Sequence, residues 1–150
     1  MYLSSNKLML PQADYWTEEQ VTPQQLLALF RQAYMPVESQ PDDRLRVVLE
    51  GSGATTVAII QDSQCIHFHS AYGFKEDATR IEKLELVNRM NDCVMMARFS
   101  VFKDDTLWAD YMLPFNGGIA PAMIVATLRR INRIISGSIT RMDSESNLVC

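Results

Sequence analysis

The chain has 150 residues, of which 47% are hydrophobic, and its 14 Lys and Arg against 18 Asp and Glu give a net charge of −4. This length suits one domain whose core is large enough to need no disulfide or metal for stability. The composition excludes the disordered, collagen-like and disulfide-scaffold classes. The acidic balance argues against a nucleic-acid partner, because neutralisation of phosphates supplies most of the affinity of such proteins.

Signals for membrane insertion and secretion are not expected in this sequence. Its apolar runs are shorter than the roughly 18 residues of a membrane span, and its first ten residues do not form the apolar segment of a secretory signal. Its cysteines are odd in number and widely spaced, which is typical of reduced thiols: Cys65, Cys93 and Cys150. We therefore expect a cytoplasmic protein that makes no membrane contact.

The first predicted element is a helix that starts at Pro23 and ends before Pro36. Thr22 can accept a hydrogen bond from a backbone N–H of the first turn, and proline suits the first position of a helix. The residue before a proline is displaced from helical geometry, which sets the far end. Residues 37–43, VESQPDD, have the composition of a polar turn, and we expect a linker there.

Three short strands are predicted next, because apolar and polar residues alternate and turn-forming residues separate the runs. These strands cover residues 44–50, 55–60 and 65–72. Between residues 76 and 91 the apolar residues recur at helical spacing, so a second helix is expected there.

The clearest hairpin of the sequence follows, with strands at residues 94–102 and 107–113 and a turn of Lys, Asp, Asp and Thr between them. A last helix starts at Pro121 and is expected to end near residue 136. The element order is α-β-β-β-α-β-β-α. Runs of consecutive strands joined by turns predict an α+β fold, in which helices pack on an antiparallel five-stranded sheet.

This pattern divides the chain into three parts. Residues 1–21 are expected to form an N-terminal arm, residues 22–136 a single α+β domain, and residues 137–150 a polar C-terminal tail that is frayed.

The stretch 86–121 carries several residues whose order is distinctive. Asn91 ends a helix, Asp104 and Asp105 form the hairpin turn, and Gly117 and Gly118 precede the last helix. This arrangement resembles the signature of the YbjN-domain family of bacterial sensory transduction regulators. The element order also resembles the type III secretion chaperone fold, which that family shares. The resemblance implies a regulator, and the family has no agreed catalytic residues to carry over to this chain.

One alternative function is a small metal-binding protein or metalloenzyme. Cys65, His67 and His69 occupy alternate positions of one predicted strand and would share one face. Two histidines in this spacing can chelate zinc. A single strand rarely presents three ligands to one tetrahedral ion, however, so we favour a half-polar sheet face with Ile66 and Phe68 in the core.

A weaker alternative is nucleic-acid binding through the last helix, which carries a basic patch of Arg129, Arg130 and Arg133 with Arg141 beyond. No aromatic residue lies between these arginines to stack on a base. We therefore favour a solvated helix face, and we expect no catalytic residues and no cofactor anywhere in the chain.

The apolar residues of the hairpin exceed what one core face needs. Large apolar side chains are expected on the second face of both strands: Val94, Met96, Phe102, Trp108 and Met112. The second helix could cover them, but a sheet that is apolar on both sides otherwise needs another subunit or a partner. We therefore predict a non-enzymatic, protein-binding or chaperone-like regulator that forms a homodimer and binds partners through these residues.

Overall fold

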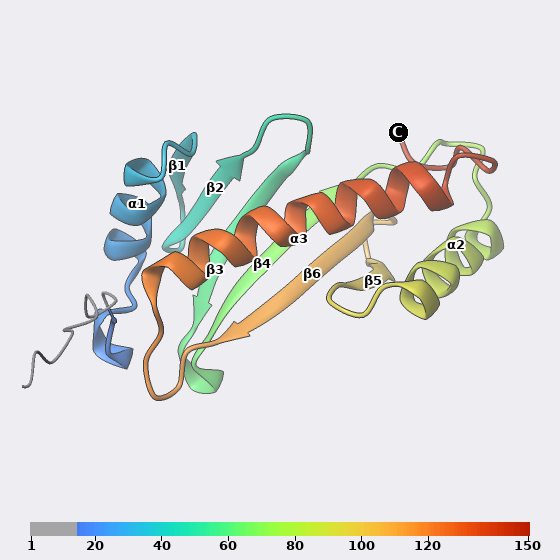
Figure 1. Ribbon diagram of the computed structural model, residues 1–150. Helices are drawn as coiled ribbons and strands as arrows, with labels where there is room; N and C mark the ends of the chain where they lie inside the picture. The colour runs from blue at the N-terminus through green and yellow to red at the C-terminus, as the bar shows by residue number, and fades with distance from the viewer. Residues whose placement is uncertain (1–14) are drawn as a thin grey trace, which may run out of the picture.

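The computed structural model describes residues 15–150, which form one antiparallel sheet and three α-helices (Figure 1). The strands, in spatial order, are β1 (Val37–Gln40), β2 (Arg44–Val48), β3 (Ala54–Ile60), β4 (Cys65–Tyr72), β6 (Leu107–Pro114) and β5 (Arg98–Val101). The helices are α1 (Pro23–Gln32), α2 (Arg80–Cys93) and α3 (Pro121–Met142), with short 3-10 helices at Glu18–Gln20 and Gln61–Ser63. In this part of the chain, no helix has the length and apolar character needed to cross a membrane.

The predicted α+β class with an antiparallel sheet is confirmed, but the sheet has six strands, not five. The additional strand, β1, lies in the segment 37–43, which was expected to be a linker. Val37 pairs with Val47 of β2, and Asp42 and Asp43 adopt positive φ angles of 59° and 56° in the connecting turn. Because β1 is a mostly exposed edge strand, it lacks the apolar alternation by which strands are recognised.

Two boundaries around the second helix also differ from the prediction. The helix begins at Arg80, not at residue 76, because Thr79 caps it: the Glu82 N–H donates to Thr79 Oγ1 over 3.3 Å, and the Thr79 N–H donates to the Glu82 carboxylate over 2.8 Å. The strand β5 contains only Arg98–Val101. Residues 94–97 are therefore a loop, and strand alternation does not apply to them.

The last helix continues to Met142, so its predicted end near residue 136 is wrong. The helix passes through Gly137 because its apolar stripe continues on both sides of that glycine. Ile131 and Ile135 are buried, and Met142 packs against the same cluster. Burial of the stripe outweighs the roughly 1 kcal/mol that a glycine costs inside a helix.

The end of the chain packs back onto the domain, although a frayed tail was expected. Asp143 accepts hydrogen bonds from the backbone N–H groups of Leu148 over 2.7 Å and Val149 over 2.9 Å. Leu148 is buried, and the Cys150 N–H donates to the carbonyl of Gly73 over 3.0 Å. The Asp143 carboxylate and backbone pairing with residues 73–75 thus hold the return of the chain.

Residues 15–21 also pack on the domain, where an arm was expected over residues 1–21. Trp16 and Ile119 exchange two backbone hydrogen bonds of 2.9 Å, and Val21 is buried. Residues 1–14 of the predicted arm lie outside the described residues.

The core consists of two apolar clusters, and α3 contributes to both. The first lies mainly between α1, the first half of α3 and strands β2 to β4; it includes Leu26, Phe30, Ile66, Phe68, Phe115 and Leu128. The second lies between α2, the second half of α3 and strands β5 and β6; it includes Leu86, Met90, Phe99, Leu107, Ile131 and Ile135. Met90, the residue before Asn91, fills a fully buried position.

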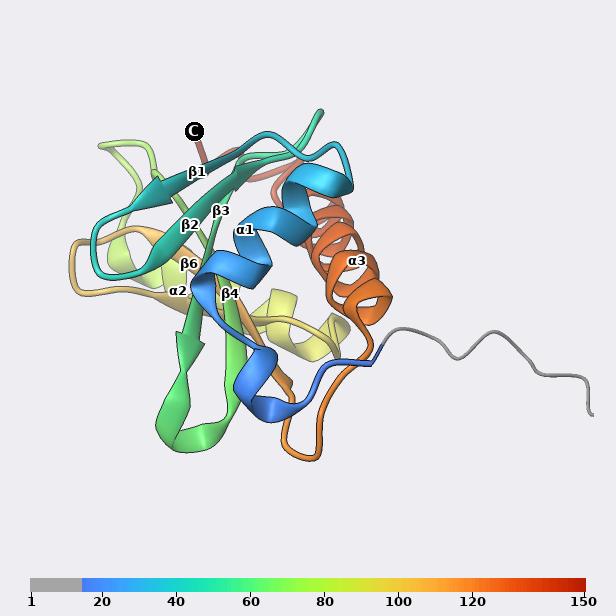
Figure 2. The same cartoon turned by 90° about the vertical axis from the view of Figure 1, so that its left-hand side faces the viewer.

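The helices leave one side of the sheet uncovered. Figure 2 shows α1 and α3 on the same side of the sheet. The helix α2 lies beside the edge strand β5 (Figure 1). Alternate strand residues point to the opposite side, which we call the outer face. Among residues 15–150, no helix packs on the outer face, so the alternative in which the second helix covers it is not observed.

Candidate functional site on the outer face of the sheet

Four ring side chains stand side by side on the outer face: His67 and His69 of β4, Trp108 of β6, and Phe102 just after β5. The ring centroids of His69 and Trp108 lie 4.2 Å apart at 16°, and those of Phe102 and Trp108 lie 4.7 Å apart at 20°. The centroid of His67 lies 5.0 Å from that of His69. We call these four residues the aromatic row. His69 and Phe102 cover the two faces of the indole ring, so an incoming base cannot stack on Trp108.

A buried carboxylate lies beside the aromatic row. Asp110 of β6 is 3% exposed and lies opposite both His69 and Arg98 in the strand register. Arg98 donates two hydrogen bonds to it, of 2.9 Å and 2.6 Å, and His67 Nε2 lies 2.9 Å from Oδ2. Burial raises the pKa of Asp110, but the hydrogen bonds from Arg98 and His67 outweigh burial and hold the pKa below its usual range. Asp110 is therefore an ionised anchor at neutral pH.

His69 is kept neutral by its surroundings. Burial, the neighbouring His67 and the charge of Arg44 lower the pKa of His69 to about 4. Its Nδ1 atom is buried without a hydrogen-bond partner among the described residues. At neutral pH, His69 thus acts as an aromatic ring packed on Trp108.

Cys65, His67 and His69 lie on one face of β4, as predicted, but they do not form a metal centre. The Cys65 thiol donates to the carbonyl of Ser63 over 3.3 Å, and His67 is held by Asp110. Between residues 15 and 150, no three His, Cys, Asp or Glu side chains are arranged to hold a metal ion.

The structure divides the five residues predicted to form a partner surface into two groups. Phe102, Trp108 and Met112 lie on the outer face, where Phe102 is 42% exposed and Met112 is 38% exposed. Val94 and Met96 are half-buried and pack against the second core cluster. The difference arises because residues 94–97 form a loop, so their side chains do not follow the alternation of β5.

A shallow hollow adjoins the aromatic row at the edge of the sheet. It has a volume of about 350 Å³, and its lining includes Met96, Arg98, Asp110, Tyr111 and Met112. It lies where β6 extends past the first residue of β5. We call this feature the edge hollow. The outer face therefore carries a ridge, the aromatic row, of which Phe102 is the exposed member, and a depression close to it.

The signature residues of the chain lie elsewhere and hold elements together. Asn91, at the end of α2, accepts a hydrogen bond from the Phe99 N–H and donates one to the Phe99 carbonyl, both of 2.9 Å. Phe99 lies in the edge strand β5, and these backbone groups would otherwise be available to another strand. Asn91 thus occupies the backbone groups of Phe99 on the β5 edge of the sheet.

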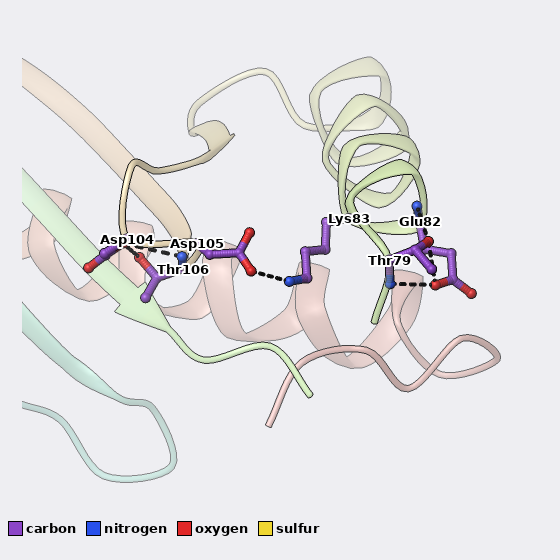
Figure 3. Close-up of polar contacts among 6 residues, drawn as sticks. All are labelled: Thr79, Glu82, Lys83, Asp104, Asp105 and Thr106. Carbon is purple, nitrogen blue, oxygen red and sulfur yellow. Dashed lines mark hydrogen bonds and ion pairs between the residues drawn. The ribbon is translucent and has the colours of Figure 1, made fainter. Parts of the chain in front are cut away.

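The acidic turn between β5 and β6 fastens the hairpin to α2 (Figure 3). Asp104 accepts hydrogen bonds from the N–H and the hydroxyl of Thr106, at 3.2 Å and 2.6 Å, which confirms the turn predicted for this pair. Asp105 adopts a positive φ of 64° and forms an ion pair with Lys83 of α2. The Lys83 side chain is nearly buried, and its Nζ lies 5.2 Å from the ring centroid of Phe74.

The glycine pair forms the predicted bend before α3. Gly117 and Gly118 have φ angles of 81° and 95°, and a Cβ on Gly118 would lie 2.6 Å from the Trp16 carbonyl oxygen. The Gly117 N–H donates to the carboxylate of Glu18. The glycine pair therefore packs against the segment 15–21. The Gly117 N–H, which could have bound an anion, bonds to the Glu18 carboxylate of the same chain.

The class of this protein follows from these features: it is an α+β domain with helices on one side of an antiparallel sheet, an uncovered outer face, and signature residues that join its elements. The chain belongs to the YbjN family, described as "Putative bacterial sensory transduction regulator", whose family model matches residues 16–144.

A solved structure with the same fold is the crystal structure of YbjN, a putative transcription regulator from E. coli. The TM-score is 0.69 at 14% sequence identity, and the match covers 85% of this chain and 94% of that one. No curated protein matches the sequence.

Proposed function

We propose that this protein is a non-enzymatic cytoplasmic regulator that works as a homodimer, in which two copies pack their outer faces together. The family description supports a regulatory role, and the solved structure of E. coli YbjN is described as that of "a putative transcription regulator". The signature residues Asn91, Asp105 and Gly118 each make a structural contact, which suits a binding protein. Cys65, Cys93 and Cys150 are free thiols, which suits a reducing compartment.

The observation that carries this proposal is the set of exposed apolar side chains on the uncovered outer face. Phe102, Met112 and Ile60 are each between 38% and 42% exposed there. Six strands spaced about 4.8 Å apart make a face about 24 Å wide, and a strand of eight residues such as β4 is about 26 Å long. The area of such a face is on the scale of the roughly 800 Å² that each partner buries in a standard interface.

A second copy suits this face because the ridge and the edge hollow lie on the same surface. In a two-fold dimer the same patch of both copies forms the interface. If one feature of the patch contacts a second feature of the partner, the reverse contact is also made. The aromatic row of each copy would then insert into the edge hollow of its partner. Methionine side chains such as Met96 and Met112 adapt easily to an inserted ring.

The mass in solution tests the homodimer. Light scattering coupled to size exclusion should give about 34 kDa, twice the chain mass of 17.1 kDa. The double substitution Phe102→Glu and Met112→Glu places one charge on the aromatic row and one in the edge hollow, and it should shift the protein to a monomer. Met123→Glu is the matched control, because Met123 is 55% exposed on α3 and lies away from the outer face.

Thermal melts of all three proteins would show that the double variant is folded. A wild-type monomer at tens of micromolar, or a dimer that persists in the folded double variant, would refute the homodimer.

A further inference from the structure

A second groove lies on the helical side of the molecule, between α3 and the loop that joins α2 to β5. Its volume is about 420 Å³. The α3 residues that line it recur at helical spacing along one side of the helix: Arg130, Arg133, Gly137 and Arg141. The opposite wall is formed by Met95 and Met96 of the loop. We call this feature the α3 groove.

The charge of the α3 groove is opposite to that of the whole chain. Arg130, Arg133 and Arg141 are exposed, and none of them has an ion-pair partner within residues 15–150. A hollow of about 860 Å³ continues the groove, because it shares Arg141 with it and adds Arg89, Asp92 and Glu145. Four arginines against two carboxylates leave a net charge of +2, whereas the chain carries −4.

The groove also offers apolar contacts. The Met95 side chain is fully exposed, and Met96 is half-buried beside it. At Gly137, an added Cβ would meet no atom within 4 Å, so a ligand can approach the helix backbone closely. The polar group of the floor is already satisfied, because the Ser138 hydroxyl donates to the Ile134 carbonyl over 2.6 Å. The groups of the groove that lack a partner are the three arginines along its rim, which would pair with negative charges.

We propose that the α3 groove binds a short acidic peptide segment of a partner protein. Carboxylates of the segment pair with Arg130, Arg133 and Arg141, and apolar side chains between them contact Met95 and Met96. Arg141 follows Arg130 by eleven residue steps along α3, a rise of about 16 Å. The arginines therefore match several carboxylates spaced along a chain. The arginines of the site lie outside the proposed dimer interface, although Met95 and Met96 line both the α3 groove and the edge hollow.

The lining of the groove favours a peptide over a nucleic acid. Proteins that bind single-stranded nucleic acid combine a basic groove with aromatic side chains on which the bases stack, and the α3 groove presents methionines instead. Guanidinium groups pair with peptide carboxylates in a bidentate geometry, and flexible methionines accept varied apolar side chains.

Fluorescence polarisation tests the proposal. The probe is a fluorescein-labelled peptide of about 15 residues built from Glu, Leu and Ala, long enough to follow the α3 stripe. Two further probes serve as comparisons: the same peptide with Lys in place of every Glu, and a single-stranded oligo-dT. The acidic peptide should bind the full-length wild-type chain, and binding should weaken as salt rises from about 50 mM to about 200 mM.

The double substitution Arg130→Glu and Arg133→Glu should weaken binding of the acidic peptide by about tenfold or more, because two favourable charge pairs become repulsive. The matched control is Arg31→Glu with Arg80→Glu, two exposed arginines outside the groove, and it should leave the affinity unchanged. Equal binding by the groove variant, equal binding of the Lys peptide, binding of oligo-dT alone, or no binding would overturn the proposal.

The two proposals fail separately. The variant Arg130→Glu with Arg133→Glu should retain the solution mass of the wild type. The outer-face variant Phe102→Glu with Met112→Glu should still bind the acidic peptide. A monomeric wild type that binds the peptide would refute only the homodimer.

Discussion

His69 shows how a single residue can make the outer face sensitive to acid. Its ring packs on Trp108 with the centroids 4.2 Å apart, and its surroundings lower its pKa to about 4 from an ordinary value of 6.5. The folded state therefore resists protonation of this ring, whereas the unfolded chain accepts the proton readily. Folding stability from the neutral ring is complete above about pH 6.5 and is lost as the pH falls towards 4.

The corresponding prediction concerns His69→Phe, which keeps a ring on Trp108 and removes the titrating group. Between pH 6.5 and 4, the free energy of unfolding of the wild type should fall by roughly 1–2 kcal/mol more than that of the variant, because a half-exposed group keeps only part of the roughly 1.4 kcal/mol per pKa unit. Urea unfolding at several pH values measures the difference. Parallel pH profiles for the two proteins would contradict the effect.

Asn91 shows how one side chain can protect an edge strand from pairing with another chain. It covers the N–H and the carbonyl of Phe99 on the free edge of β5. An open edge is a template for pairing with another chain, and native sheets protect such edges. The Asn at this point of the family signature thus has a physical reason, which is protection of the sheet edge.

Replacing Asn91 with Ala should lower the free energy of unfolding by about 1–3 kcal/mol, because two hydrogen bonds to strand backbone are lost. The exposed edge should also increase light scattering on heating. Asn88→Ala is the matched control, since Asn88 is exposed on the same helix and no side-chain hydrogen bond is found for it in the described part of the chain. Equal stability and equal scattering of the two variants would show that Asn91 does not protect the edge.

The elements differ in how far the sequence could predict them. The cap at Thr22, the acidic turn and the glycine bend depend on local chemistry, and the structure confirms them. The strand β1 was missed because an edge strand needs no apolar face. Helical spacing of apolar residues does not give the whole buried side of α2: Ile81 is 70% exposed, whereas Lys83 is buried because Asp105 pairs with it across the fold.

The candidate site could be predicted only where its residues follow the regular alternation of a strand. Regular alternation placed Trp108 and Met112 on the face opposite the core, because they lie within the long strand β6. Alternation failed for Met96, which lies in a loop. The pairing of Asp110 with Arg98 and His67 joins three strands, and only the strand order brings these residues together.

At the scale of the whole molecule, α3 makes one folding unit of two apolar clusters. Its first half packs in the first cluster and its second half in the second. Between them, Asn132 accepts a hydrogen bond of 2.9 Å from Thr55 of β3, and the Thr55 and Ser70 hydroxyls lie 3.1 Å apart. These polar groups are buried, so they fix the position of α3 on the sheet only when all of them are satisfied.

Unfolding should therefore be a single transition in which both clusters are lost together. The two tryptophans report on different halves, because Trp16 packs on the first cluster and Trp108 lies over β6 beside Phe102. Urea curves from tryptophan fluorescence and from far-UV circular dichroism should coincide for the wild type.

Asn132→Ala should lower the free energy of unfolding by about 1–3 kcal/mol, because Thr55 loses a buried partner. Thr140→Ala on the exposed side of α3 should change it by less than about 0.5 kcal/mol. Separate transitions in the wild type would mean that α3 does not unite the clusters, and equal effects of the two substitutions would mean that the buried bond to Asn132 does not hold the helix in place.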